Sequence, residues 1–441
     1  MRHLILIAGV WLAVVPAKTA QGELPTGPVL ALHEAIEIAL SQHPSLRVRQ
    51  AEVEAARQRV WQQAAGYLPG GGYTYVYSRQ QRPVSAAVGG VNVGDGQEQQ
   101  RRPAAQLFNF HSTNVGLSQV LFDFGRTLDA IRSAQASVEA SRADLETTKQ
   151  TVIFNTKRAY YSALSSQRLL QVAEETVRQN QKHVEEARAR FEVGLAPRFD
   201  VTQAQVQLSN AILDRVSARN NVALARETLR TAMGVTGPFG YTLVDTLTRE
   251  PLVFDDEALL SRAYANRPEL RGLRARERAA ARDVSALRKR YLPSVTGNAQ
   301  YNWTGREYPL QEGWSWSVTL TFPLFDDILT AARVGEARAS LRGVQAQQED
   351  LRQQVALEVR QGLLNVQEAE ESIRVSEQVL VQAQENLALA EGRYSAGVGN
   401  IIELTDAQVL LTSARANTVQ ALYAYKTAVA ELERAVGQQF E

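Results

Sequence analysis

The stretch "WSWSVTLTF", from Trp314 to Phe322, decides what kind of fold this chain can have. Apolar residues alternate with Ser and Thr along its whole length, and this period of two predicts a β-strand with one apolar and one polar face. Almost all of the remaining sequence has the spacing of α-helix. The apolar face of the strand therefore needs a covering, either from helices of the same chain or from a lipid membrane.

The composition excludes several classes of protein. The 441 residues carry a formal net charge of +1, so no basic surplus attracts nucleic acid, and we expect no nucleic-acid partner. Cysteine is absent, which excludes disulfides, thiolate metal sites and a lipid anchor on an N-terminal cysteine. The five histidines lack metal-ligand spacing, and no motif pairs a nucleophile with a base. We expect no enzymatic activity, no cofactor and no metal site.

Residues 1–20 have the pattern of a secretory signal peptide. Arg2 and His3 precede an apolar run, Leu4 to Val15, that is too short to span a membrane as a helix, and small residues follow it. The sequence therefore predicts export. A buried N-terminal helix is the alternative interpretation.

The chain contains an internal tandem repeat. The segment ending in Tyr-Leu-Pro at Pro69 resembles the segment ending in Tyr-Leu-Pro at Pro293, at an offset of 224 positions. Further along, "LFDFGRTLDAIRSAQAS" from Leu121 matches "LFDDILTAARVGEARAS" from Leu324, at an offset of 203. The first copy therefore has 21 extra residues, which we assign to a loop that includes the glycine-rich Gly89 to Gly96. The predicted segments are a signal peptide (1–20), a first repeat (21–235), a connector (236–256) and a second repeat (257–441).

Each repeat has the same predicted layout. A helical segment, about 30–66 or 257–291, precedes a β-hairpin, a very long helix, a glycine turn and another helix. Neither Gly nor Pro occurs from Arg126 to Val193, which permits a helix about 100 Å long. Apolar residues recur every seven positions along this segment, as in Ile131, Val138 and Leu145, so neighbouring helices must cover the stripe. Helical periodicity alone would favour a soluble bundle.

The predicted strands argue against a soluble bundle. The hairpins span about 71–121 and 294–323, with strands at about 73–78, 114–121, 295–304 and 314–322. Apolar and uncharged polar residues alternate in them, as in a transmembrane β-barrel with a water-filled lumen. Aromatic residues at their ends resemble the girdles at membrane interfaces, and the predicted interfacial aromatics are Trp303, Trp314, Trp316 and Phe322. A soluble sheet packed on a helix remains the alternative.

Four strands cannot close a barrel, and an open edge in lipid leaves backbone groups unpaired. Three chains would supply twelve strands, an even number that bacterial barrels adopt. The sequence therefore predicts a mainly α fold with transmembrane β-structure: a homotrimer with a 12-stranded barrel, four strands per chain, in contact with outer-membrane lipid. The long helices would continue it as a hollow α-helical barrel.

Four motifs resemble the TolC family of outer-membrane efflux proteins across essentially the whole mature chain. They are "LSQVLFDFGR", "LTFPLFDD", "ARFEVGLAPRFDVTQAQ" and "GRYSAGVGNIIELTDAQ". The resemblance implies a trimeric channel-tunnel in the outer membrane of a Gram-negative bacterium, with its helical part in the periplasm. It implies the passive exit duct of an efflux or secretion system, which opens by an iris-like movement of the periplasmic helical tip. The implied partners are a periplasmic adaptor protein and an inner-membrane pump of RND, ABC or MFS type.

The same resemblance implies a gate at the two glycine turns. The constricting acidic pair of the family falls on Glu403 and Asp406, and a tyrosine that ties the closed state falls on Tyr394, with its acidic partner on Asp200. The adaptor would contact the turns near Gly194 and Gly397. The predicted site therefore comprises Asp200, Tyr394, Glu403 and Asp406 for the gate, and Gly194 and Gly397 for the adaptor.

Two features of the turns leave alternatives open. Well-studied members of the family carry an arginine where this sequence has Gly399, so Arg198 or other contacts would have to replace it. Asn400-Ile-Ile-Glu403 and Asp200-Val-Thr-Gln203 both match a helix capping box, which explains Glu403 and Asp200 without a gate. Asp406 lies beyond the first helical turn, where capping explains it less well.

A structural or adhesive trimer with a coiled-coil stalk and a barrel anchor is the alternative function. Adhesins of this kind place four consecutive strands at the C-terminus. Here two hairpins are separated by about 170 residues and the chain ends in helix, which favours the duct.

Overall fold

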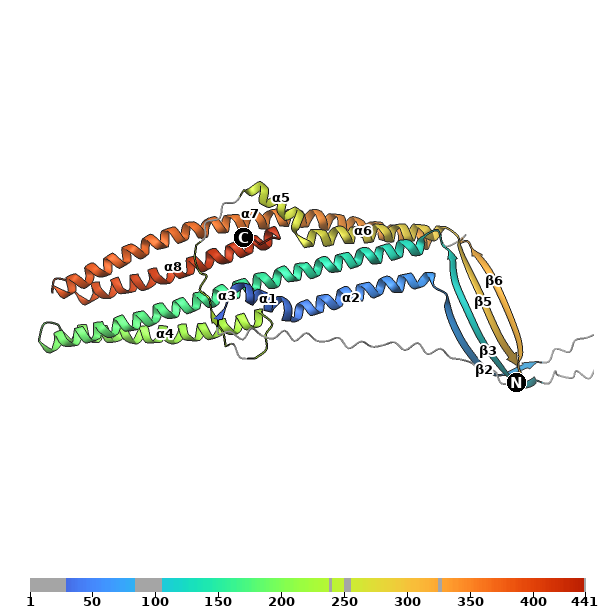
Figure 1. Cartoon of the computed structure of the whole chain (residues 1–441), viewed down its shortest axis with the longest axis horizontal. Coiled ribbons are helices and arrows are strands. Elements are labelled where there is room, and N and C mark those ends of the chain that lie inside the picture. Colours follow the sequence, from blue (N-terminus) through green and yellow to red (C-terminus); the bar gives the residue numbers. More distant parts are fainter. Residues whose placement is uncertain (1–28, 84–104, 238–239, 250–254, 324–326, 440–441) are drawn as a thin grey trace, which may run out of the picture. The chain divides into compact units, whose positions relative to one another are not determined.

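The computed structural model describes residues 29–83, 105–237, 240–249, 255–323 and 327–439 (Figure 1). The predicted signal peptide and the glycine-rich loop lie outside these residues. The elements, in chain order, are β1 (Val29–Leu30), α1 (Leu32–Gln42), α2 (Pro44–Ala64), β2 (Gly70–Pro83), β3 (Ala105–Phe122), α3 (Arg126–Glu192), α4 (Arg198–Ala232), β4 (Thr242–Leu243), α5 (Asp256–Asn266), α6 (Pro268–Arg288), β5 (Ser294–Gly305), β6 (Gln311–Thr321), α7 (Asp327–Ser395) and α8 (Ile401–Val436). The second half of the chain, from β4 to α8, repeats the element order of the first half, from β1 to α4.

The chain forms two compact units, and each is described separately. The turn unit comprises Met1–Pro44, Val152–Glu250 and Glu368–Thr427, and it contains both glycine turns. The sheet unit comprises Ser45–Thr151, Pro251–Gln367 and Ala428–Glu441, and it contains the four long strands. The helices α3, α7 and α8 contribute residues to both units.

The sheet has the strand order β2-β3-β5-β6, with every neighbouring pair antiparallel. All four predicted strands are confirmed, and all extend at least one residue further at their N-terminal ends than predicted. Phe322 lies just beyond β6 rather than in it. The first hairpin joins the second through β3 and β5, so β2 and β6 remain the edge strands of the chain.

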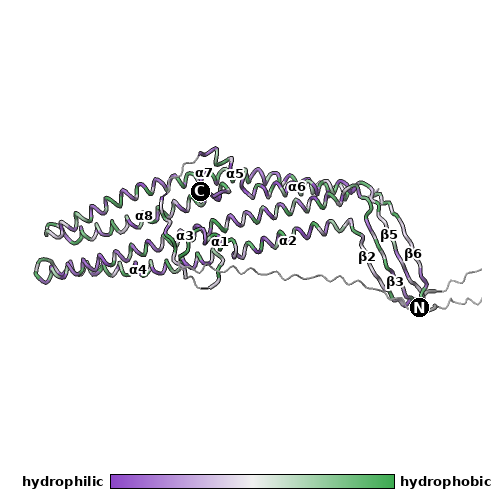
Figure 2. The backbone as a smooth tube through the Cα atoms, in the orientation of Figure 1, coloured by the Kyte–Doolittle hydropathy of each residue, from purple (hydrophilic) through white to green (hydrophobic). Residues whose placement is uncertain are grey.

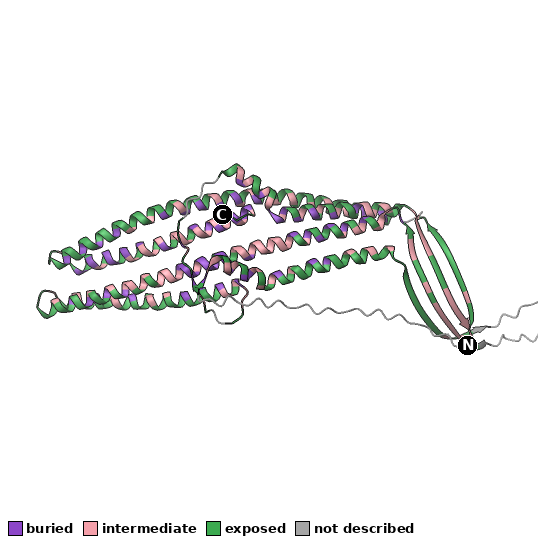
Figure 3. Cartoon of the chain, in the orientation of Figure 1, coloured by how far each residue is buried: buried purple, intermediate pink, exposed green. Residues whose placement is uncertain are grey.

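The long helices are as long as the sequence predicts. The helix α3 has 67 residues and its repeat mate α7 has 69. The predicted heptad stripe is buried at several positions in both helices, including Val138, Val152, Val334 and Val355. Buried residues recur in bands along the helices in Figure 3, and apolar and polar residues alternate along them in Figure 2. The stripes therefore provide the contacts between neighbouring helices.

The prediction of one helical segment before each Tyr-Leu-Pro was wrong. The first segment divides into α1 and α2 at His43, and the second into α5 and α6 at Arg267. Both residues precede a proline, and both adopt an extended conformation, with ψ of 124° and 120°. Proline disfavours helical geometry at the preceding residue, and it lacks the N–H that would continue the helix.

Each helix break receives a glycine from the end of the same repeat. Gly234 follows α4 and packs on His43, while Gly437 follows α8 and packs on Asn266 and Arg267. Both glycines have positive φ, 69° and 75°. A Cβ at Gly234 would lie 2.7 Å from the Cα of His43, so no other residue fits this contact without displacement.

In the sheet unit, ion pairs join α3 of the first repeat to α6 of the second. The Asp129 side chain is 2% exposed and accepts hydrogen bonds from Lys289 and Ser285, each at 2.6 Å. Burial would raise the pKa of Asp129, but the Lys289 and Ser285 hydrogen bonds and the nearby positive charges lower it. Nearer the middle of α3, Glu139 pairs with Arg278 at 2.5 Å.

In the turn unit, the core forms around Tyr160 on α3. Its hydroxyl lies 2.9 Å from the carbonyl oxygen of Leu30 and 2.8 Å from that of Val244, so it joins the short β1 and β4 segments to the long helix. Burial raises the pKa of Tyr160 to about 12. Among the described residues, we find no helix long and apolar enough to cross a membrane.

Candidate functional site

The candidate site lies in the turn unit, where α3 meets α4 and α7 meets α8. Gly194 and Gly397 have φ of 77° and 74°, a conformation that favours glycine. Leu195 N–H donates to the Arg190 carbonyl at 2.8 Å, and Val398 N–H donates to the Arg393 carbonyl at 3.0 Å. These are the bonds of a Schellman motif, which ends a helix at a left-handed glycine. The two repeats therefore build the same turn.

Arg190 joins the two turns. Its guanidinium donates to the Tyr394 carbonyl at 2.7 Å and to the Ser395 carbonyl at 3.2 Å. It also lies over the ring of Tyr394, 4.4 Å from the centroid, in a cation–π contact. Glu186, one turn back on α3, forms an ion pair with the guanidinium at 3.1 Å. The last turn of α3 is thereby attached to the last turn of α7.

Tyr394 is 5% exposed and belongs to a hydrophobic cluster of α7 and α8. Its hydroxyl is buried without a hydrogen-bond partner among the described residues. Burial raises the pKa of Tyr394, and the negative charge of Asp200 raises it further. Burial also raises the pKa of Asp200, and the positive charge of Arg190 opposes this rise. The charge of Asp200 therefore acts on the Tyr394 hydroxyl, and that of Arg190 acts on both residues, but no hydrogen bond joins Tyr394 to Asp200 among the described residues.

The capping role predicted for Asp200 was wrong. The helix α4 begins at Arg198, with Pro197 at the N-cap position, so Asp200 lies inside the first turn. No side-chain capping hydrogen bond forms at this end. Asp200 still places a negative charge at the positive end of the helix dipole. The proline sets the helix start because it lacks an N–H and has a suitable φ.

The acidic pair lies at the start of α8. Asn400 Oδ1 accepts the Glu403 N–H at 2.8 Å, which is half of the predicted capping box. The Glu403 carboxylate instead accepts from Arg393 Nε at 3.3 Å. Asp406 is exposed and forms no ion pair or side-chain hydrogen bond with any residue that the structure describes. At a spacing of three, Glu403 and Asp406 share one exposed face of α8.

Gly399 has little room for the arginine that the resemblance implies. A Cβ there would lie 3.0 Å from both the Cβ of Arg393 and the backbone N of Tyr394. Arg198 is exposed and forms no ion pair with the described residues. The cations of the turns are Arg190 and Arg393, which the sequence reasoning did not select. They are repeat mates at the offset of 203, and this equivalence could have identified them.

Six large apolar side chains around the turns are more than two-fifths exposed: Phe191, Val193, Leu195, Phe199, Val398 and Ile402. They belong to both turns, on either side of Gly194 and Gly397. Apolar surface of this extent is typical of a protein interaction site.

His183 lies on α3, beneath the turns. Its side chain is half-buried, and its Nε2 atom is buried and has no hydrogen-bond partner among the described residues. Burial lowers the pKa of His183, while Glu391 of α7, Glu186 of α3 and the nearby amide of Gln408 of α8 oppose the shift. The packing of three helices here therefore favours neutral histidine.

In the sheet unit, three of the predicted interfacial aromatics, Trp303, Trp314 and Trp316, lie on one face of the sheet. Trp314 and Trp316 are each 71% exposed, and Trp314 lies opposite Tyr301 in the register. The rings of Tyr301 and Trp303 lie 4.5 Å apart. An apolar face so exposed is typical of contact with lipid or with another chain.

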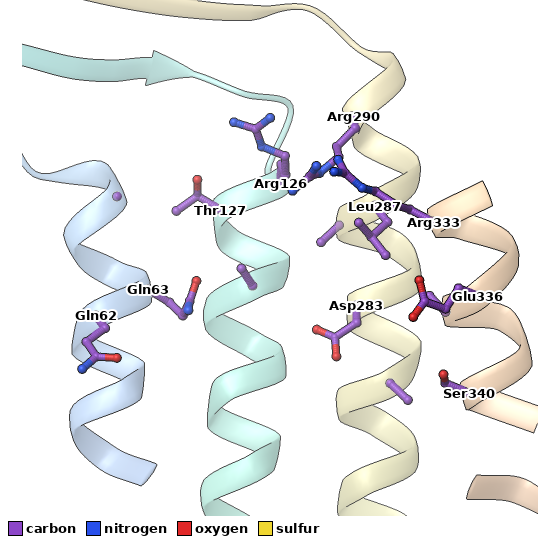
Figure 4. Close-up of a pocket in the computed structure, with 15 residues that line it drawn as sticks. Gln62, Gln63, Arg126, Thr127, Asp283, Leu287, Arg290, Arg333, Glu336 and Ser340 are labelled. Atoms are coloured by element: carbon purple, nitrogen blue, oxygen red, sulfur yellow. The ribbon is translucent and has the colours of Figure 1, made fainter. Parts of the chain in front are cut away.

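The sheet unit also contains an open pocket of about 940 Å³ between the upper ends of α2, α3, α6 and α7 (Figure 4). Arg126, Arg290 and Arg333 line it together with Asp283 and Glu336. The carboxylates offset most of the positive charge. None of the predicted site residues lines this pocket.

The fold is that of the outer-membrane channels of efflux systems. The chain resembles the crystal structure of the Campylobacter jejuni CmeC outer membrane channel, with a TM-score of 0.80 at 16% identity over 93% of this chain and 86% of that chain. Its sequence is 24% identical to outer membrane protein TolC of Escherichia coli, over 92% of this chain and 82% of that protein. It is 27% identical to protein CyaE of Bordetella pertussis, over 93% and 84%.

The model of the family described as outer membrane efflux protein matches residues 35–235 and 259–438. The chain belongs to this family. The predicted fold class, a trimeric barrel of four strands per chain continued by a helical barrel, is confirmed, and so are the outer-membrane location and the efflux-channel function. The family is one of channels, not of enzymes, and the adhesive alternative is not favoured.

Proposed function

We propose that the two glycine turns form the gate of this efflux channel, with Tyr394 and Asp200 tying the closed state and Glu403 and Asp406 lining its aperture. The observation that carries the proposal is Arg190, which attaches α3 to the carbonyls of Tyr394 and Ser395. These contacts are few and local. Breaking them would release the end of the α7–α8 pair from α3, which is the separation that an iris-like opening requires.

Glu403 and Asp406 give the aperture its charge. Both are exposed, and they lie on one face of α8. Three copies would form a ring of six carboxylates, which attracts cations and repels anions. Arg393 neutralises part of this charge in each copy through its contact with Glu403.

Single-channel recording in planar bilayers tests the ring. We expect Glu403→Ala/Asp406→Ala to lower the preference for cations over anions and to change the conductance. Asp214→Ala, which removes an exposed carboxylate from α4, is the matched control and should leave both unchanged. Unchanged selectivity and conductance in the double variant would sink the proposed ring.

A periplasmic adaptor protein and an inner-membrane pump of RND, ABC or MFS type are the proposed partners. The exposed apolar side chains around Gly194 and Gly397 support an adaptor contact at the turns. Relatives named as efflux pump outer membrane proteins support a pump as the third component.

Copurification tests the docking surface. We expect Leu195→Asp/Val398→Asp to reduce recovery of the adaptor at least tenfold, because charges would replace two of the most exposed apolar side chains of the turns. Leu213→Asp, on the exposed surface of α4, is the control. Equal recovery with both variants would contradict adaptor binding at the turns.

A further inference from the structure

We propose that the open pocket of the sheet unit binds cargo in transit, and that it takes small zwitterions whose two charges lie about 10 Å apart. The pocket has a volume of about 940 Å³, and residues of α2, α3, α6 and α7 line it (Figure 4). The inference goes beyond the proposed gate. The gate lies at the turns that follow the ends of α3 and α7, whereas the pocket lies where these two helices begin.

The pocket faces the lumen of the channel. Figure 4 shows the four helices side by side, and side chains from all four line the same pocket. A row of helices encloses a common pocket only on its concave side, because side chains on the convex side diverge. In a closed helical barrel, the concave side of each row faces the lumen. A molecule that passes through the channel therefore meets this pocket.

The tandem repeat divides the lining into two equivalent walls that differ in charge. Gly66, just after α2, and Ala130 of α3 belong to the wall from the first repeat. Their mates, at offsets of 224 and 203, are Arg290, just after α6, and Arg333 of α7, which line the other wall. Two arginines thus stand in the second repeat where the first has uncharged residues. The charge is a local feature of this wall and not a property of both repeats.

Three arginines gather at the end of the pocket nearest the strands. Arg126 begins α3, Arg290 lies in the 3-10 turn Lys289–Tyr291, and Arg333 lies in the second turn of α7. Arg290 and Arg333 form no ion pair within the part of the chain that the structure describes, and Arg126 approaches Asp123 only at 4.0 Å. Guanidinium groups bind carboxylate and phosphate groups through paired hydrogen bonds. This end therefore suits an anionic group.

Two carboxylates lie further from the strands. Asp283 precedes Arg290 by seven residues, about 10 Å along the helix, and Glu336 follows Arg333 by three residues. Both carboxylates are exposed and form no ion pair with the described residues, although Arg333 and Glu336 have a spacing that permits one. The opposite charges of the pocket thus remain separated along its length. This end suits a basic group.

The lining between the charges is apolar or uncharged. Leu287 lies about one helical turn from both Asp283 and Arg290, and Gln62 and Gln63 of α2 belong to the other wall. An apolar body with a basic group at one end and an acidic group at the other matches this arrangement. Each ion pair with such a molecule would remain in contact with water and be weak. Weak binding is what a duct requires if its cargo is to leave.

A tripeptide tests the assignment, because three extended residues separate the terminal charges by about 10 Å. The probes are Ala-Phe-Ala with free termini, its N-acetyl form, which keeps only the negative charge, and its C-terminal amide, which keeps only the positive charge. Saturation-transfer NMR on the purified trimer in lipid nanodiscs at low salt measures their affinities. We expect the free tripeptide to bind about fivefold more tightly than either blocked form.

Two double variants separate the two ends of the pocket. In Arg290→Gln/Arg333→Gln, the free tripeptide should lose its advantage over the amide. In Asp283→Asn/Glu336→Gln, it should lose its advantage over the N-acetyl form. Arg262→Gln/Arg338→Gln is the matched control, because it removes two exposed arginines that do not line the pocket. This variant should bind all three peptides as the wild-type protein does.

Three results would overturn the site: equal affinities of the three peptides for the wild-type trimer, no binding of the free tripeptide at millimolar concentration, or the same losses in the control variant. The comparison of blocked and free peptides uses the wild-type protein, so it does not depend on the folding of any variant. The ion selectivity of the gate is measured separately. Failure of either proposal therefore leaves the other standing.

Discussion

Arg190 combines two functions that a lysine could not combine. Its planar guanidinium spans two carbonyl oxygens while one face covers the Tyr394 ring. It also lies near Asp200, so a single side chain connects the groups that we assign to the closed gate. The gate is therefore sensitive to one residue of the first repeat.

We predict that Arg190→Ala loosens the turns. Loss of charged hydrogen bonds to two carbonyls should cost about 2 kcal/mol, or roughly 30-fold faster amide exchange around 190–200 and 394–400. Hydrogen exchange measured by mass spectrometry checks this. Arg198→Ala removes a neighbouring exposed arginine and should leave exchange unchanged; equal effects of the two variants would refute the prediction.

A second prediction concerns His183. Its pKa is lowered in the folded chain, so the folded state prefers neutral histidine. The stability that follows from this preference is complete above the ordinary pKa of about 6.5 and is lost as the pH falls toward the lowered value. We expect the melting temperature of the wild-type protein to drop from pH 7.5 to pH 5.5. The melting temperature of His183→Gln should drop by less over the same range. His33→Gln, at an exposed position of α1, should retain the full drop.

At the scale of elements, the ionic contact around Asp129 holds the two repeats together. It connects α3 to α6, which are separated by more than 70 residues of chain, and the Asp129 carboxylate is almost inaccessible to water. A buried anion of this kind is tolerated only because a cation and a hydroxyl donate to it.

We predict that Asp129→Asn destabilises the protein by about 3 kcal/mol, since it leaves Lys289 beside a neutral group in a partly buried place. Thermal or denaturant unfolding of the purified trimer measures it. Glu139→Gln removes an acid from an exposed pair on the same helix and should cost less than about 1 kcal/mol. A cost below 1 kcal/mol for Asp129→Asn would contradict the role given to this contact.

The sequence predicted those elements that depend on local pattern. Strict alternation identified β6, and the absence of Gly and Pro from Arg126 to Val193 predicted α3 almost to the residue. The sequence also predicted the glycine turns, because they too depend on local pattern. The breaks at His43 and Arg267 were missed because helical periodicity continues across them, although each proline was a signal.

Contacts between distant segments could not be predicted in this way. Nothing in the local sequence around Asp129 indicates that Lys289 approaches it, and nothing around Arg190 indicates Tyr394. Such contacts depend on how the helices pack, which the periodicity does not determine. The gate was inferred from a family resemblance, and the side chain that holds its turns together became visible only in the folded chain.

For the whole molecule, the face of β6 that carries Trp314, Trp316 and Val318 is exposed in the single chain. In an outer-membrane barrel, this face meets lipid and the alternating Ser and Thr residues meet water. Neighbouring residues of this one strand therefore face lipid and lumen in turn.

We predict that Val318→Arg costs about 2–4 kcal/mol, because it places a charge among lipid tails. Thr319→Arg, on the next residue, should cost about 1 kcal/mol or less, because its side chain points to the lumen. The yield of assembled trimer in outer-membrane fractions measures the difference. Equal losses from the two substitutions would contradict the assigned faces.

The Glu139–Arg278 pair has a consequence for how the two halves of the chain recognise each other. The tandem repeat places Arg342 where the first copy has Glu139, at the offset of 203, and Glu54 where the second copy has Arg278, at the offset of 224. The two copies therefore carry opposite charges at equivalent positions, so α7 in the place of α3 would set Arg342 beside Arg278. Two halves of similar sequence are thus told apart by charge, and the pair specifies which half takes which place.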